Sequence, residues 1–361
     1  MAYHLLPMTR LGLVPYQSKL SKLFQQVNRI LREGGKVYQV EQKCFAKTER
    51  FPEGHYLFPG SLLVESGTEL TDCATDLVEG GIEPYIAPLR LKRNIAFLNG
   101  KNCAAFCSEP FFAFFAAYGL DVDEINDQQV RDGVLREYDL LIVPGGPDAG
   151  ESYYEGLGEQ GYEQIRSFVA GGGGYLGSCA GSYFPLSAPA GSTAGHVWLN
   201  MIPVTDLQGL DYWRTGTGFV RIQFNDTAHP VAYGLAFGVP STLDVIYWEG
   251  PAFQLLDGHN VKVIASYQDF LASGCEPPSW DISSNEIAVE AMKWLNPLTR
   301  ERFDRHLAGK PAIIEAEYGR GKLVLLAPHA EFGTCGASPA MEDNPNYLLL
   351  MNSLYYLSRG M

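Results

Sequence analysis

The spacing of apolar residues in the first part of the chain changes from helical to strand-like. Between residues 17 and 35 the apolar positions are three and four apart, which predicts an amphipathic helix that stops at Gly34-Gly35. These positions are Leu20, Leu23, Phe24, Val27, Ile30 and Leu31. The runs KVYQVEQ and SLLVES then predict strands, and residues 68–79 predict a second helix. We therefore expect residues 1–90 to form a small N-terminal α/β extension.

From residue 91 onward, short apolar runs alternate with helical patterns. The runs RNIAFLNG, YDLLIVPGG and GYLGSC predict buried strands, and PFFAFFAAYG and GYEQIRSFVAGGG predict helices between them. FVRIQF, VKVIASY and the hairpin AIIEAEYGRGKLVLLAPH predict further strands, and YLLLMNSLYYLS predicts a final helix. Continuous apolar strands that alternate with helices indicate a parallel sheet covered on both faces. We expect one α/β domain over residues 91–361, with ligands bound beyond the carboxyl ends of its strands.

Charge and composition exclude several kinds of partner. Of the 361 residues, 46% are hydrophobic, which is typical of a folded globular protein. The formal net charge is -14 and the sequence has no cluster of Lys and Arg, which argues against binding to nucleic acid or to anionic lipid. No apolar run approaches the roughly 18 residues of a membrane span, and the N-terminus lacks the pattern of a secretory signal. We expect a cytoplasmic protein whose partner is a small molecule, and the oligomeric state stays open.

The cysteines do not follow the spacing of a disulfide framework or a zinc site. Their number is odd and their spacing irregular, which is typical of free thiols in a reducing compartment. Cys103 and Cys107 could meet on one helical turn, but no second pair or histidine cluster completes a zinc site, which favours two small core residues. The sequence therefore predicts no metal and no cofactor. The seven are Cys44, Cys73, Cys103, Cys107, Cys179, Cys275 and Cys335.

The stretch Gly177–Gly181, GSCAG, has the form of a nucleophile elbow centred on Cys179. In such a turn the residues two before and two after the nucleophile come close together, so they must be small. Cys179 would sit at a helix N-terminus, which stabilises a thiolate, and the N–H of Ala180 would face a substrate oxyanion. The alternative is a cysteine packed as a small residue in a glycine-rich strand end.

Two other strand ends carry residues that suit this chemistry. Gly145 and Gly146 follow the run LLIVP, where they form either an ordinary turn or a second oxyanion donor through Gly146. His329 follows the strand GKLVLLAP, and Glu331 two residues later could orient its imidazole. A histidine at a strand end can also be an ordinary core or surface residue. The remaining pocket candidates are Gly145, Asp148, Ser182 and Tyr183, of which Asp148 fits a solvated loop equally well.

LIVPGGP, GYLGSCAGSYF and APHAEFG, in this order and with these separations, resemble the class I glutamine amidotransferase-like superfamily. Within this superfamily, the sequence motif YLG-x-CAG-x-YF is most similar to the N-terminal domain family of biotin-protein ligases. The resemblance covers roughly residues 92–358 and implies a flavodoxin-like α/β fold with a Cys-His-Glu triad. Carried over by motif position, the implied roles are Cys179 as nucleophile, His329 as base, Glu331 as its orienting group, and Gly146 and Ala180 as oxyanion donors.

Two differences between this sequence and the family pattern narrow the range of activities that the resemblance implies. Ser182-Tyr183-Phe184 follows the elbow where glutamine-using enzymes usually carry a glutamine, so glutamine is not implied as the substrate. Biotin ligation needs a separate catalytic loop, and the nearest string, residues 319–322, predicts a hairpin turn. The sequence favours a cysteine-dependent hydrolase or amidotransferase-like enzyme acting on an amide or related acyl group. The alternative function is a non-catalytic binding or regulatory module with the same fold. A third possible function is a redox role for Cys179, but no cysteine close to it in the sequence could act as the resolving thiol.

Overall fold

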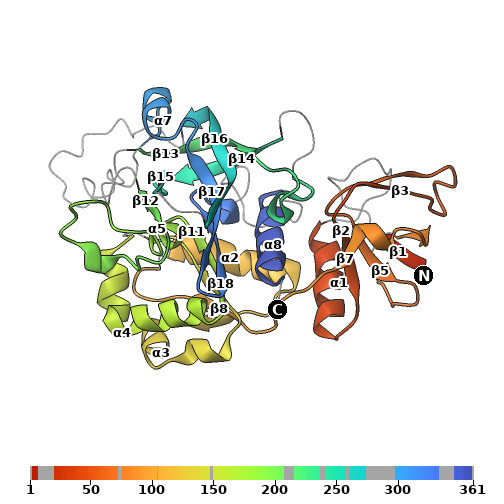
Figure 1. Cartoon of the computed structure of the whole chain (residues 1–361), viewed down its shortest axis with the longest axis horizontal. Coiled ribbons are helices and arrows are strands. Elements are labelled where there is room, and N and C mark those ends of the chain that lie inside the picture. The colour runs from red at the N-terminus through yellow and green to blue at the C-terminus, as the bar shows by residue number, and fades with distance from the viewer. Residues whose placement is uncertain are drawn as a thin grey trace.

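The computed structural model shows a large α/β body with a smaller lobe beside it (Figure 1). It describes residues 2–6, 20–71, 75–103, 105–146, 149–206, 215–235, 241–256, 260–273, 297–332 and 345–359. Within these ranges, no helix is both long enough and apolar enough to cross a membrane.

The lobe is built on a five-stranded antiparallel sheet with the order β6-β1-β5-β2-β7. Its strands are β1 (Ala2–Leu6), β2 (Val37–Val40), β5 (Leu62–Glu65), β6 (Asp76–Glu79) and β7 (Ile86–Pro88), with helix α1 (Leu20–Arg32) and the hairpin β3 (Cys44–Ala46) and β4 (His55–Leu57). The prediction of a helix over residues 68–79 is wrong, because β6 forms an antiparallel ladder with β1. The N-terminal residues supply the neighbouring strand, and pairing along its length outweighs the local helical spacing.

Helix α1 attaches the lobe to the α/β body. The ring of Phe24 stacks on that of Tyr118 with centroids 5.4 Å apart. Asn28 Nδ2 donates to the Tyr118 carbonyl at 2.8 Å, and the Tyr355 hydroxyl donates to Asn28 Oδ1 at 2.8 Å. Buried side chains of α1 therefore belong to the same hydrophobic core as the body. A domain boundary at residue 90 stays a prediction.

The body is organised around a nine-stranded sheet with the order β14-β13-β16-β17-β18-β11-β10-β8-β9. Five neighbouring strands are parallel: β8 (Ile95–Leu98), β9 (Asp123–Ile125), β10 (Leu140–Val143), β11 (Gly174–Ser178) and β18 (Gly321–Leu326). The other four continue the sheet as antiparallel strands: β13 (Thr217–Phe224), β14 (Thr242–Trp248), β16 (Val261–Ser273) and β17 (Pro311–Tyr318). The predicted hairpin turn lies between β17 and β18.

Helices cover both faces of the parallel half (Figure 1). On one face α2 (Ala105–Tyr118) packs against α8 (Pro345–Leu357), with the rings of Phe114 and Tyr347 5.2 Å apart. On the other face lie α3 (Asp127–Arg131) and α4 (Glu151–Ala170). Every residue of β10 and β11 is buried, which is why these strands are continuous apolar runs. The predicted fold class is confirmed, and the antiparallel strands extend its sheet.

Shorter elements complete the described body. They are β12 (Val204–Asp206), β15 (Phe253–Leu255), α5 (Ala180–Tyr183) and α7 (Arg300–His306), with single 3-10 turns such as Ala330–Phe332. The element α5 follows β11 after the single residue Cys179, and the turn Ala330–Phe332 follows β18, so both lie at the same end of the sheet.

Candidate active site

Three adjacent parallel strands end at one edge of the sheet and bring the predicted site together. In the register of β10, β11 and β18, Val143 lies opposite Gly177, and Gly177 lies opposite Leu325. The chain segments that leave these strands carry Gly145, Cys179 and His329. Because the strands are parallel and in step, residues far apart in the sequence meet beyond their carboxyl ends.

Cys179 occupies a strained turn between β11 and α5. Its φ of 50° and ψ of -113° are a conformation that side-chain-bearing residues rarely adopt. A Cβ atom on Gly177 would lie 2.3 Å from the carbonyl oxygen of Gly181. The predicted steric reason for small residues two before and two after the cysteine is therefore confirmed. Backbone strain of this kind costs about 1–3 kcal/mol and is concentrated at functional sites.

His329 and Glu331 form a buried pair beside the cysteine. His329 Nδ1 lies 2.7 Å from Glu331 Oε1, and the two side chains are 1% and 0% exposed. The carboxylate also accepts the Ser178 hydroxyl, with Oγ 2.9 Å from Oε2. Ser178 was not among the predicted site residues, because its place beside Cys179 in the sequence does not reveal that its hydroxyl faces a residue 153 positions away.

The protonation of His329 is governed by its two neighbours. Burial disfavours the charged imidazolium, but the charges of Cys179 and Glu331 and hydrogen bonds to both outweigh it. The pKa of His329 is raised to about 10. Since Nδ1 faces Glu331, the Nε2 nitrogen is left for Cys179. The arrangement therefore favours a protonated, positively charged His329 imidazole beside Cys179 at neutral pH.

Two aromatic residues that the sequence analysis did not assign to the site hold the imidazole in place. The ring of Phe332 stacks on His329 with centroids 4.4 Å apart and an interplanar angle of 12°. The Trp248 ring lies 6.5 Å from His329, and the Trp248 carbonyl oxygen lies 3.4 Å from Cys179 Sγ. Trp248 ends β14 in the antiparallel half of the sheet, so the position of its side chain depends on long-range strand pairing.

The two glycines after β10 lie against the site. A Cβ on Gly145 would be 3.1 Å from His329 Cε1 and 3.2 Å from Cys179 Cβ, so this residue borders both side chains. Gly146 packs on Asn102, whose carbonyl oxygen would lie 1.8 Å from an added Cβ. Ala180 is the first residue of α5, where an N–H has no partner within the helix. The oxyanion roles of Gly146 and Ala180 stay predictions.

The other pocket candidates differ in position. Ser182 is fully buried, and its Oγ lies 2.7 Å from the Leu326 carbonyl and 3.0 Å from that of Gly177, so this hydroxyl braces the elbow instead of lining a pocket. The buried Tyr183 hydroxyl donates to the Glu249 carbonyl at 3.2 Å, which places it beneath the segment after β14. Asp148 is outside the described residues. Within the described ranges, no cluster of three or more His, Cys, Asp or Glu side chains could hold a metal ion.

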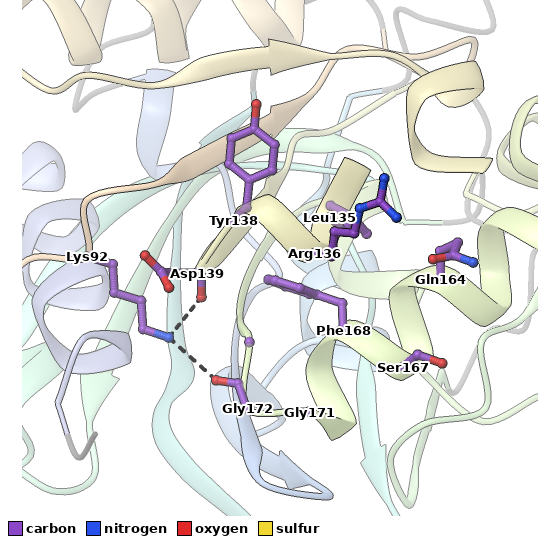
Figure 2. A pocket seen from close by; sticks show the side chains of 11 residues that line it. Lys92, Leu135, Arg136, Tyr138, Asp139, Gln164, Ser167, Phe168, Gly171 and Gly172 are labelled. Atoms are coloured by element: carbon purple, nitrogen blue, oxygen red, sulfur yellow. Dashed lines mark hydrogen bonds between the residues drawn. The ribbon is translucent and has the colours of Figure 1, made fainter. Parts of the chain in front are cut away.

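A separate cavity of about 350 Å³ lies at the opposite edge of the sheet (Figure 2). It is lined by Asp139 and Gly173, the residues directly before β10 and β11. Lys92, which is 9% exposed, extends between two strand starts and donates from Nζ to the Asp139 carbonyl at 2.8 Å and, more weakly, to that of Gly172 at 3.5 Å. Burial lowers the pKa of Lys92, and nearby Asp139 opposes this effect. Because its ammonium group is hydrogen-bonded to these backbone carbonyls, Lys92 links the chain segment before β10 to the segment before β11.

We expect Lys92→Met to destabilise the protein by about 1–3 kcal/mol, because two half-buried carbonyls would lose hydrogen bonds from a charged donor, although the Asp139 carbonyl keeps the Gly174 N–H at 2.9 Å. Urea unfolding measures this loss. Lys36→Met is the matched control, since Lys36 is 66% exposed in its ion pair with Glu65 and should contribute under about 1 kcal/mol. The reactivity of Cys179 should be unchanged in both variants. Equal stability of the two variants would show that the Lys92 contacts have no structural role.

The parallel half of the sheet carries an elbow cysteine at one strand end and a His–Glu pair at the next. The chain belongs to the family described as "Biotin-protein ligase, N terminal", whose sequence profile matches residues 119–356. The family resemblance drawn from the sequence motifs is confirmed.

Two curated relatives are similar over part of the chain. The biotin–protein ligase of Schizosaccharomyces pombe is 32% identical over 209 residues, which are 56% of this chain and 27% of that protein. An uncharacterized protein of Chlamydia muridarum is 30% identical over 206 residues, which are 54% of this chain and 60% of that protein. The chain thus spans 27% and 60% of the lengths of these relatives.

Solved structures with a similar arrangement share little sequence. A cytoplasmic protein from Salmonella typhimurium has a TM-score of 0.43 and 15% identity, covering 74% of this chain and 100% of that one. A glutamine amidotransferase has a TM-score of 0.42 and 16% identity, covering 72% of this chain and 98% of that one.

Proposed function

We propose that this protein is a cysteine-dependent hydrolase or amidotransferase-like enzyme that acts on a small amide or related acyl compound. The observation that carries the proposal is the buried His329–Glu331 pair, with 2.7 Å between nitrogen and oxygen, beside the strained elbow at Cys179. Burying a carboxylate with an imidazole is costly unless the two are paired, and here the pair is directed at a thiol.

In the proposed reaction, the Cys179 thiolate attacks the acyl carbon and the carbonyl oxygen becomes an oxyanion. In this proposal the backbone N–H groups of Gly146 and Ala180 receive that charge. The imidazolium of His329 gives its Nε2 proton to the departing amine as the carbon–nitrogen bond breaks, which leaves a thioester on Cys179. Neutral His329 then takes a proton from water, whose oxygen attacks the thioester; the acid leaves and the thiolate returns. Glu331 keeps the imidazole oriented and stabilises its charge.

The substrate class is proposed from the chemistry of the site. A Cys-His-Glu arrangement acts on acyl carbons, and the net charge of -14 argues against a polyanionic substrate. Since the chain spans 27% of the fission yeast ligase, biotin ligation is not transferred to it.

The test is turnover of a panel of small amides and esters, including glutamine, with thioester detection by intact-protein mass spectrometry. We expect Cys179→Ser to lower any turnover about 10³-fold or more, because the nucleophile acts as a unit with its base. Cys103→Ser is the matched control, since Cys103 lies in the same region with its Sγ 3.1 Å from the Leu98 carbonyl. If the wild type neither turns over nor acylates while Cys179 stays reactive, the protein is the binding or regulatory module.

A further inference from the structure

The fold places a second thiol next to the candidate nucleophile, although the two cysteines are 72 positions apart in the sequence. Cys107 lies on α2, the helix after β8, and is 2% exposed. A Cβ on Gly145 would lie 3.1 Å from Cys107 Sγ and 3.2 Å from Cys179 Cβ. Together with His329 Cε1 these are the atoms nearest to that position, so the two cysteines border the same side of Gly145.

The two thiols differ in chemical character. Burial raises the pKa of the Cys107 thiol well above its usual range, and the charges of Cys179 and Glu331 add to this effect. Cys107 therefore stays a protonated thiol at neutral pH, so the first oxidation falls on Cys179, and Cys107 gives up its proton only as it attacks the oxidised Cys179. Cys179 lies beside the His329 imidazolium and is 7% exposed, so small reagents have some access to it.

We propose that Cys107 is a resolving cysteine, and that Cys107 and Cys179 form a reversible disulfide when a hydroperoxide oxidises Cys179. This modification goes beyond the proposed hydrolase function, because it requires only a reachable Cys179 thiolate. It also supplies the resolving thiol that the sequence analysis did not find.

The steps balance with a hydroperoxide as the oxidant. The Cys179 thiolate attacks the terminal oxygen of the hydroperoxide, and the O–O bond breaks with its electron pair passing to the departing oxygen. That oxygen takes a proton from the His329 imidazolium and leaves as the alcohol or water, while Cys179 becomes a sulfenic acid. The Cys107 sulfur then attacks the Cys179 sulfur, its thiol proton leaves with the sulfenic hydroxyl as water, and the S–S bond forms. Cys179 Sγ lies 3.4 Å from the Trp248 carbonyl, so its side chain rotates toward Gly145 for this step.

A neighbouring cysteine provides the matched control. Cys103 lies four residues before Cys107 and is also a free thiol, but its Sγ lies 3.1 Å from the Leu98 carbonyl instead of beside Gly145. Removal of Cys103 therefore tests whether loss of any nearby buried thiol has the same effect as loss of Cys107.

The experiment treats the reduced full-length protein with stoichiometric hydrogen peroxide, blocks free thiols at low pH and maps the cysteine peptides by mass spectrometry. We expect a Cys107–Cys179 disulfide in the wild type, with Cys179 reactivity restored by dithiothreitol. In Cys107→Ala, Cys179 should become sulfinic acid, with irreversible loss about fivefold greater than in the wild type. Cys103→Ala should behave as the wild type.

A wild-type map in which Cys179 pairs with Cys335, Cys275 or Cys73, pairs between molecules, or goes directly to sulfinic acid would overturn the proposal. The disulfide map is measured on the wild type and needs no variant. It therefore tests the proposal even if the Cys107→Ala protein fails to fold. The result is also separate from catalysis: absence of amide turnover leaves the disulfide test unaffected, and absence of the disulfide leaves the triad proposal unaffected.

Discussion

Replacing His329 by alanine is expected to slow alkylation of Cys179 by iodoacetamide roughly 10- to 100-fold near pH 6.5, because a nearby opposite charge stabilises the thiolate. The pKa of His329 is raised to about 10, so the wild type keeps the imidazolium through acid and neutral pH and loses it only as the pH rises toward 10. The difference between wild type and variant should therefore be largest at acid pH and shrink as the solution becomes alkaline.

The measurement is alkylation with limiting reagent at several pH values, with all seven cysteines followed by mass spectrometry. His196→Ala is the control, since His196 is exposed and its ring contacts Tyr154 instead of the site. Glu331→Gln, which removes the charge next to His329 while nearly preserving side-chain size, should give an intermediate rate. If Cys179 reacts at the same rate in His329→Ala and wild type at every pH, the two residues are not an ion pair and the triad proposal fails.

Gly177→Ala is expected to destabilise the protein by about 3 kcal/mol or more and to remove the preferential reactivity of Cys179. The added methyl group would lie 2.3 Å from the Gly181 carbonyl oxygen, which is a backbone atom and cannot swing away as a flexible side chain could. Relief of the clash requires the elbow to open, and the opened turn would no longer hold the thiol against His329. Urea unfolding followed by tryptophan fluorescence gives the stability change.

Gly195→Ala separates this clash from a general cost of adding a methyl group. The nearest atom to a Cβ on Gly195 is Ala188 Cβ at 3.8 Å, an ordinary van der Waals contact. We expect this variant to stay within about 0.5 kcal/mol of the wild type. Gly177→Ala with wild-type stability and wild-type Cys179 labelling would mean that the elbow tolerates a wider turn than the structure has.

Local patterns predicted most of the elements of the body because each is strongly periodic or continuously apolar. The run YDLLIVPGG became β10 with all four residues buried, and the pattern ahead of Gly34-Gly35 became α1. The helix predicted over residues 68–79 failed at β6, where the partner strand β1 comes from the other end of the lobe. A short segment whose apolar spacing fits both a helix and a strand becomes a strand when another strand lies beside it to pair with. The sequence pattern does not indicate which segments will lie side by side.

The sequence by itself determined the fold class, the elbow and the candidate triad, because strand ends, small residues and a His-x-Glu spacing are local properties. Only the tertiary structure decided what surrounds that site. The parallel pairing of β11 with β18 brings Cys179 to His329, and the same alignment turns Ser178 toward Glu331. The antiparallel strands place Trp248 against the thiol, and α2 sets Cys107 across Gly145. These contacts join residues that are distant along the chain, and a pattern of burial indicates that a residue is covered without indicating which residue covers it.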